Sequence, residues 1–185
     1  MPVRVERLPA DGLERLAEID RSEEVRARFR QAGTELVREP VAESVPDFFA
    51  DGAFHSVPAL VSEWQPVVDA GGALLGGFVG GRLAGVALLG GEVAPGVLQL
   101  ALLYVSRQDR RKGVAGALLG ELARRARARG ADALYVSSVP SDSAVGFYLA
   151  RGFRPTMPLP ELLAREPEDI HLLLPLASDP PAGKL

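Results

Sequence analysis

The segment Val97–Gly120 most constrains what this chain can fold into. It begins with an apolar run, Val97–Val105, that only Gln99 interrupts. A short polar turn follows, and a glycine then opens a segment in which apolar residues recur every four positions, as Val114, Leu118, Leu122 and Ala126. The pattern predicts a buried strand, a basic turn and an amphipathic helix in direct succession.

Three cations, Arg110, Arg111 and Lys112, stand just before the predicted helix. Cations are unfavourable at that end of a helix, by roughly 0.3–1 kcal/mol each, whereas the free backbone N–H groups of a first helical turn bind anions. We therefore expect an anionic ligand here, and a phosphate-bearing ligand is the natural candidate. The alternative is a solvated basic turn at the surface.

Composition narrows the class of protein. With 185 residues, of which 47% are hydrophobic and 24% charged, the chain has the make-up of a soluble globular protein. A net charge of −3 gives no general attraction to nucleic acid. We see no apolar run of about 18 residues and no signal-like amino terminus, so we expect a cytoplasmic location and no membrane partner.

Metal and thiol chemistry are also disfavoured by composition. The chain has no cysteine, which excludes disulfides, thiolate metal sites and cysteine nucleophiles. Its two histidines, His55 and His171, lie far apart in the sequence and leave little for a histidine-based metal site. We expect no metal.

Residues 1–72 predict helices and a loop after one strand. The strand covers Val3–Leu8, and Asp11 is placed to cap a helix after it. A second helix is predicted from Ser22 to before Pro40, with one apolar side formed by Val25, Phe29, Ala32, Leu36 and Val37. Residues 40–57 predict a long loop with aromatic anchors. Pro58 then opens a helix that includes Trp64 and ends at Gly71 and Gly72.

Acidic residues recur around this loop, at Glu35, Glu39, Glu43, Asp47 and Asp51. They form either a solvated acidic face or a field that attracts an amine substrate. Trp64 is interpreted as a core anchor in preference to a ligand platform.

From residue 73 the pattern predicts a sheet. Two apolar runs, Ala73–Val79 and Arg82–Leu89, flank Gly80-Gly81 and predict a hairpin. Two further turns, at Gly90-Gly91 and Pro95-Gly96, lead to the strand Val97–Val105. Since that strand is apolar on both faces, it should be central and covered by helices on both sides. The glycine doublets do not form a dinucleotide-binding or P-loop motif.

The remaining segments alternate between strands and helices. The helix after Gly113 ends in four arginines, Arg124, Arg125, Arg127 and Arg129, which complement its dipole, so that nucleic-acid binding is not needed to explain them. Strands are predicted at Ala133–Val139, Phe153–Met157 and Ile170–Leu176, with a short helix after Ser141 and a proline-rich acidic connection over 158–169. Residues 178–185 predict a frayed tail.

Two motifs in this order resemble the GNAT superfamily of N-acetyltransferases. The family's phosphate turn, [Q/R]-x-x-G-x-[G/A], is matched by Arg110–Ala115, directly after an apolar strand. A later family helix, A-x-x-F-Y-x-x-x-G-F, is matched by Ala144–Phe153. The resemblance is clear over about 73–176 and only topological over 1–72, and the run Glu166–His171 looks like the end of some bacterial members.

The resemblance implies an α/β fold with a mixed, mostly antiparallel central sheet, helices on both faces and splayed central strands. It implies a single N-acetyltransferase domain over 1–177, in which 1–72 forms the substrate side and 73–176 the coenzyme-binding core. The implied co-substrate is acetyl-CoA, and the implied partner is an amine acceptor. The sequence leaves a homodimer open.

The resemblance also assigns roles to residues. Backbone amides of the turn would hold the pyrophosphate of acetyl-CoA, and the end of the central strand would pair with the pantetheine amides, provided that this strand diverges from Ala133–Val139 at a bulge. Tyr148 would be the general acid that protonates the departing thiolate; the alternative is that it only packs in the core. The implied coenzyme-binding residues are Leu103, Tyr104, Val105, Arg110, Arg111, Lys112, Gly113, Val114, Ala115, Ser141, Ala144 and Phe147.

The sequence departs from the family pattern at the general base. Many members carry a carboxylate on the central strand, at the position that Gln99 occupies here, and an amide cannot take a proton. Water, a neutral amine, or a group from residues 40–63 would then have to serve. The candidates in that segment are His55, Glu63, Asp51 and Glu43.

Three functions follow from these observations. The leading one is direct acetyl transfer from acetyl-CoA to a primary amine of a small molecule or peptide. The second is an acyl-CoA-binding sensor that is catalytically weak or inactive, which Gln99 favours slightly. The third is a nucleic-acid binder that uses the basic helix.

Overall fold

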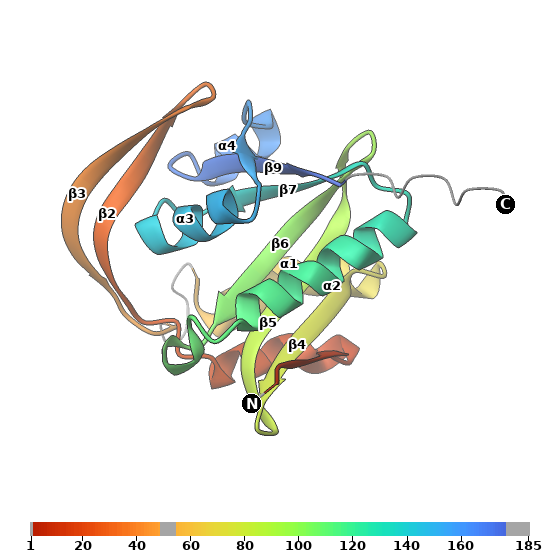
Figure 1. Cartoon of the computed structure of the whole chain (residues 1–185). Coiled ribbons are helices and arrows are strands. Elements are labelled where there is room, and N and C mark those ends of the chain that lie inside the picture. Colours follow the sequence, from red (N-terminus) through yellow and green to blue (C-terminus); the bar gives the residue numbers. More distant parts are fainter. Residues whose placement is uncertain (1, 49–54, 177–185) are drawn as a thin grey trace, which may run out of the picture.

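The computed structural model describes residues 2–48 and 55–176, and a seven-stranded sheet forms its centre (Figure 1). All neighbouring strands in this sheet are antiparallel except β6 and β7, which are parallel. The predicted mixed, mostly antiparallel α/β fold is therefore confirmed. In spatial order the strands are β1 (Arg4–Arg7), β4 (Ala73–Val79), β5 (Arg82–Ala94), β6 (Val97–Val105), β7 (Ala133–Ser138), β9 (Ile170–Pro175) and β8 (Arg154–Pro155).

Helices cover both faces of the sheet, as Figure 1 shows. On one face α2 (Val114–Ala128) packs on β4, β5 and β6, and on the other α1 (Val57–Asp69) packs with the 3₁₀ helix η1 (Ala10–Glu18). Two shorter helices, α3 (Asp142–Ala150) and α4 (Pro160–Arg165), lie in the C-terminal part of the chain. Within the described ranges, no helix combines the length and the apolar character that crossing a membrane requires.

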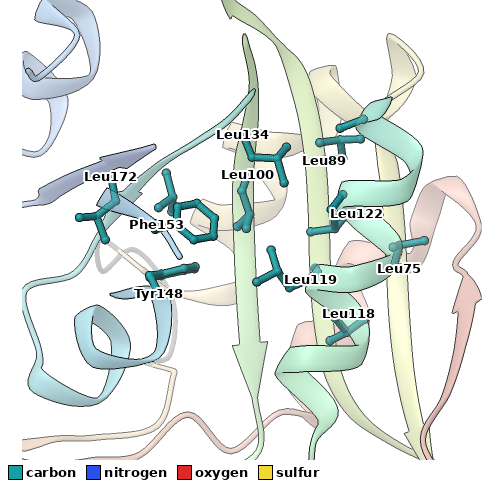
Figure 2. Close-up of a cluster of buried hydrophobic side chains, with 14 of the residues drawn as sticks. Leu75, Leu89, Leu100, Leu118, Leu119, Leu122, Leu134, Tyr148, Phe153 and Leu172 are labelled. Atoms are coloured by element: carbon teal, nitrogen blue, oxygen red, sulfur yellow. The ribbon is translucent and has the colours of Figure 1, made fainter. Parts of the chain in front are cut away.

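The central strand β6 contributes to a core on each face. Leu100 belongs to the cluster beneath α2, where Figure 2 shows it near Leu119 and Leu122. Leu102 belongs to the cluster beneath α1, together with Trp64, which is 8% exposed. The prediction that Val97–Val105 is central and covered on both sides is confirmed, and Trp64 is a core residue.

The two central strands separate after a short pairing. Only Val97–Gln99 of β6 pairs with Ala133–Tyr135 of β7. The separation coincides with a bulge in β6, because Leu100 and Leu102 face consecutive residues of β5 and Ala101 is the extra residue. Beyond the bulge, β6 keeps its pairing with β5 as far as Val105. The divergence at a bulge that the family resemblance implied is therefore present.

The helix predicted from Ser22 to before Pro40 is wrong. The chain forms an antiparallel hairpin there, β2 (Glu23–Ala32) and β3 (Glu35–Val45), which turns at Gly33 with φ of 61°. Tertiary contacts decide the outcome: the Phe29 N–H donates to the Pro140 carbonyl at 2.8 Å, and Val25 and Ala27 are buried on one face of β2. The hairpin thereby packs against the start of α3.

Four smaller expectations also need correction. Residues up to Val45 belong to β3, so the predicted 40–57 loop begins later, and its residues 49–54 lie outside the described ranges. Gly90 and Gly91 do not form a turn but lie inside β5, where its register against β6 shifts. Asp11 lies within η1, whose N-cap position is Pro9. The connection 158–169 contains α4. The predicted tail, 178–185, lies outside the described ranges.

Close packing of α2 on the sheet depends on Gly85 of β5. A Cβ atom at this position would lie 2.9 Å from the Tyr104 carbonyl oxygen and 2.9 Å from Val114 Cγ1. We predict that Gly85→Ala lowers the free energy of unfolding by about 1–3 kcal/mol, because either β6 or α2 must shift. Urea unfolding measures this change.

The matched control is Gly120→Ala on α2. A Cβ atom at Gly120 would meet nothing within 4 Å, and alanine favours a helix by about 1 kcal/mol over glycine. Gly120→Ala should therefore leave stability unchanged or raise it. Equal stability of the two variants would contradict the close approach at Gly85.

Candidate active site

A cavity of about 660 Å³ opens where β6 and β7 separate. The phosphate-type turn, the end of β6, the start of α3, the β2–β3 hairpin and residues 166–169 all contribute to its walls. The structure thus brings together nearly all the site residues that the sequence predicts. Those that line the cavity are Leu103, Tyr104, Val105, Arg110, Arg111, Gly113, Val114, Ala115, Ser141, Ala144, Phe147 and Tyr148.

Lys112 is the predicted site residue that does not line the cavity. Its ammonium nitrogen lies 3.3 Å from Oδ1 of Asp109, and Asp109 also pairs with Arg82 at 2.8 Å. Asp109 is fully buried. Its main-chain N–H also donates to the Asp109 carbonyl at 3.4 Å, so Lys112 helps to fasten the turn to the sheet through both its side chain and its backbone.

The turn itself is shaped to hold an anion. Arg111 and Gly113 both have left-handed backbone conformations, with φ of 61° and 87°. The first hydrogen bond within α2 runs from Ala117 N–H to the Gly113 carbonyl at 2.9 Å, so the preceding N–H groups have no partner inside the helix. Successive N–H groups in such a turn form a concave site for negative charge. Arg110 stabilises it by donating to the Arg21 carbonyl at 2.9 Å.

Besides Arg21 and Arg28, a further arginine lines the cavity, Arg151 at the end of α3. Its guanidinium group lies over the Phe147 ring, 5.2 Å from the centroid, and against Gly116, where a Cβ atom would come within 2.9 Å of it. Sequence reasoning missed Arg151 as a site residue because it lies 35 positions after Gly116 and only folding brings the two together. The turn end of the cavity therefore carries Arg110, Arg111 and Arg151.

Tyr148 lies at the edge of the core and at the wall of the cavity (Figure 2). Its ring contacts Phe153 edge-on at 5.0 Å between centroids and is 6% exposed. No hydrogen-bond partner for its hydroxyl group is found within residues 2–48 and 55–176. Burial, and then the Tyr104 hydroxyl, raises the pKa of Tyr148 well above its ordinary value, so the hydroxyl stays protonated at neutral pH.

Ser141 serves as the N-cap of α3, as predicted. Its hydroxyl oxygen accepts a hydrogen bond from the Ala144 N–H at 3.4 Å. Arg28 of β2 forms an isolated bridge with Ser141. The hairpin therefore lies directly beside the turn that begins α3, and residues of both line the cavity.

Away from the turn, the cavity is lined by carboxylates, among them Glu166, Glu168 and Asp169. Burial, followed by the charges of Asp169 and Glu63, raises the pKa of Glu166 to about 7. Burial also raises the pKa of Asp169, although its carboxylate accepts a hydrogen bond from the Ser137 hydroxyl at 2.8 Å. The sequence places these acids in the 158–169 connection, where we expect determinants of acceptor specificity, but it gives none of them an individual role because nothing local marks them as facing a cavity.

The candidate bases from residues 40–63 occupy different places. His55 and Glu43 line the cavity, and Glu43 pairs with Arg28 at 3.1 Å. Glu63 pairs with Arg165, and Asp51 lies outside the described ranges. Gln99 is not among the lining residues and pairs with Tyr135 in the stretch before the strands separate. The amide at position 99 therefore says little about proton transfer in this cavity.

The raised pKa of Glu166 predicts a pH dependence of stability. A carboxyl group whose pKa rises from an ordinary 4.5 to about 7 on folding stabilises the fold below pH 4.5, and this contribution is lost as the pH rises through 7. The wild type should therefore lose free energy of unfolding between pH 5 and pH 8. Because glutamine cannot ionise, this loss should be smaller in Glu166→Gln by on the order of 1–2 kcal/mol.

Urea unfolding at the two pH values measures this effect. Glu161→Gln, on the exposed side of α4, is the control and should keep the wild-type pH dependence. The same pH dependence in Glu166→Gln as in the wild type would show that burial does not perturb this carboxyl group.

The fold occurs in solved acetyltransferase structures. Nourseothricin acetyltransferase is 20% identical, with a TM-score of 0.70 and coverage of 96% of this chain and 100% of that one. A putative streptothricin acetyltransferase from Bacillus anthracis, in complex with acetyl coenzyme A, is 16% identical with a TM-score of 0.70, covering 97% and 100%. The PaiA N-acetyltransferase from Thermoplasma acidophilum, in complex with coenzyme A, is 17% identical with a TM-score of 0.59, covering 95% and 99%.

Sequence comparison adds the family. No curated protein matches the chain significantly. The sequence model of the acetyltransferase (GNAT) family, however, matches residues 31–153, which is more than half of the chain and includes the turn, the end of β6 and Tyr148. The match and the fold agree with the two motifs, and the chain belongs to the GNAT family of acetyltransferases.

Proposed function

We propose that this protein transfers an acetyl group directly from acetyl-CoA to a primary amine of a small molecule or peptide. The observation that carries the proposal is that one cavity joins an anion-binding turn, the end of a strand that has left its neighbour, and the buried hydroxyl of Tyr148. These are the three groups that a phosphate-bearing thioester substrate needs. Structures with the same fold contain acetyl coenzyme A or coenzyme A.

The residues at the turn fit a pyrophosphate. The N–H groups from Arg111 to Ala115 would donate to its oxygens, and Arg151 would add a charge from the opposite wall. Because β7 has left β6 at this level, the main chain of Leu103–Val105 has no strand partner on that side within the described residues, although the Val105 carbonyl accepts from Arg110 Nε at 3.4 Å. An extended, amide-bearing chain can pair with this strand edge. Pantetheine has that shape and chemistry.

The chemistry we propose is a single displacement. A neutral amine attacks the thioester carbonyl while N–H groups of β6 polarise its oxygen. Tyr148 holds its proton at neutral pH and lines the cavity, which supports a role as the acid that protonates the departing thiolate. Because the chain contains no cysteine, the reaction cannot pass through an acetyl-cysteine intermediate on the enzyme.

The position of Gln99 no longer favours the alternative of a coenzyme-binding sensor. That interpretation depended on Gln99 at the usual place of the base, and Gln99 does not line the cavity. Ionisable groups do line it, on the side away from the turn. We therefore retain the enzyme as the proposed function.

Two assays test the proposal in sequence. Calorimetric titration with acetyl-CoA should show binding with Kd well below 1 mM. Thiol release should then be measured with polyamines, aminoglycosides and lysine-containing peptides. No binding at about 1 mM would exclude a coenzyme site, and binding without thiol release for every amine would support the sensor instead.

Gly113→Val tests the turn. Nothing lies within 4 Å of a Cβ atom at Gly113, so the cost of the substitution comes from the left-handed backbone, which valine adopts poorly. We predict that acetyl-CoA affinity falls at least tenfold. Gly120→Val on the same helix is the control and should bind as the wild type does. Normal affinity in Gly113→Val would contradict the assignment of the turn.

Tyr148→Phe tests the general acid. The ring and its packing against Phe153 remain, and only the hydroxyl group is lost. We predict that turnover falls about 100-fold, whereas the Kd for acetyl-CoA stays within about threefold. Tyr135→Phe provides a comparison, because the Tyr135 hydroxyl hydrogen-bonds to His171 away from the cavity and should not matter for turnover. An unchanged rate in Tyr148→Phe would remove it as the acid.

A further inference from the structure

The acceptor side of the cavity contains a carboxylate that the fold holds in place. Glu166 follows α4, and its N–H donates to the Leu162 carbonyl at 3.1 Å. The Asp169 N–H in turn donates to the Glu166 carbonyl at 3.1 Å. The Glu166 side chain lines the cavity and is 30% exposed, and its Oε2 lies 3.9 Å from Nε2 of His55. The helix and the turn therefore hold the backbone N–H and C=O groups of Glu166 in place.

Negative charge exceeds positive charge around Glu166. Asp169 and, from α1, Glu63 face it and disfavour its ionisation. Arg165 favours ionisation but pairs with Glu63 and lies over the Trp64 ring at 5.6 Å, so only part of its charge acts on Glu166. A second cation placed beside Glu166 would relieve this repulsion, and an acceptor ammonium group is such a cation.

The remaining groups that face Glu166 do not supply this charge. His55 precedes α1, and burial together with the charge of Arg21 lowers its pKa, which keeps the ring neutral near pH 7. Tyr104 projects from β6, and burial raises its pKa to about 12, with Glu166 contributing to the rise. Both side chains are thus uncharged neighbours at neutral pH.

The other carboxylates at the cavity wall are less available. Glu43 and Glu168 both pair with Arg28, at 3.1 and 3.7 Å. Asp169 accepts the hydrogen bond from Ser137. Glu166, by contrast, has only His55 within ion-pair distance among the described residues. Because the pKa of His55 is lowered, its imidazole is neutral near pH 7 and does not balance the carboxylate charge.

Tyr104 connects the two ends of the site. Its hydroxyl group responds to the charge of Glu166 and itself raises the pKa of Tyr148. All three side chains line one cavity. Tyr148 and Glu166 therefore both lie within electrostatic reach of the Tyr104 hydroxyl group.

We propose that Glu166 is the acceptor-side catalytic residue, which binds the incoming amine as an ammonium ion and takes its proton. The acceptor is then a primary amine that is cationic in solution. This inference rests on the proposed function and adds to it the group that was missing at Gln99. His55 is a positioning residue that borders the carboxylate.

The proton balance of the step is complete. The ammonium N–H bond breaks and its proton moves to the Glu166 carboxylate, which leaves a neutral amine. The amine nitrogen forms a bond to the thioester carbonyl carbon, and the C–S bond breaks as Tyr148 gives its proton to the sulfur. The second N–H proton returns to Tyr148, and Glu166 releases its own proton to solvent. The products are the acetamide, free coenzyme A thiol and one proton.

The test is the pH dependence of kcat/KM for the best amine among spermidine, an aminoglycoside and a lysine-containing peptide. In the wild type, kcat/KM should fall as the pH drops below about 7, because a protonated Glu166 accepts no proton. Glu166→Gln should lower kcat/KM at pH 7.5 at least 100-fold and remove this inflection, with the Kd for acetyl-CoA within twofold. Glu166→Asp keeps a carboxylate, so it should recover part of the rate and keep the inflection.

Glu161→Gln is the matched control on α4, outside the cavity lining, and should stay within twofold of the wild type throughout. A rate within threefold of the wild type in Glu166→Gln, or an unchanged inflection, would overturn the assignment of Glu166 while leaving the proposed function intact. A wild-type protein that binds no acetyl-CoA and acetylates none of the three amines would overturn both. Measuring acetyl-CoA affinity in each variant separates loss of a base from loss of the fold.

Discussion

The early separation of β6 from β7 is the constraint on which the site depends. Parallel pairing ends at Gln99, and the bulge at Ala101 turns the rest of β6 away from β7 while β5 continues to hold it. Backbone N–H and C=O groups in a sheet require partners, so a strand edge in a cavity favours a ligand with amide groups. The N-terminus of α2 lies at the end of the same strand and supplies the anion site. One local change in pairing therefore opens a strand edge beside the turn, and these are the two halves of the coenzyme cleft that we propose.

The two ends of the cavity differ in charge, and each end is supported by its own surroundings. At the turn, Arg110, Arg111 and Arg151 lie near the N-terminus of α2, and the buried Asp109 anchors the turn through Arg82 and Lys112. At the other end, burial and neighbouring carboxylates raise the pKa values of Glu166 and Asp169. A dipolar cavity of this kind suits a reaction between an anionic donor and a cationic acceptor, because each substrate neutralises the end that it enters.

Local sequence patterns predicted the core well because strong periodicity and glycine turns coincide there. The strands over Ala73–Val79 and Val97–Val105, the helix after Gly113 and the cap at Ser141 are present in the structure. The hairpin over 23–45 was missed because Val25, Phe29, Ala32 and Leu36 are spaced as on a helix, and contacts with the Pro140 region and α3 decide its form. Local patterns also could not identify Arg151 and Glu166 as site residues, because their side chains reach the cavity only after folding.

A crystal structure of the protein with acetyl-CoA tests the central claim most directly. We predict the pyrophosphate on the amides from Arg111 to Ala115, the pantetheine beside Leu103–Val105 in the gap between β6 and β7, and the thioester sulfur near the Tyr148 hydroxyl. Coenzyme bound elsewhere on the protein, or bound in this cavity in the reverse direction with its pyrophosphate at the Glu166 end, would contradict it.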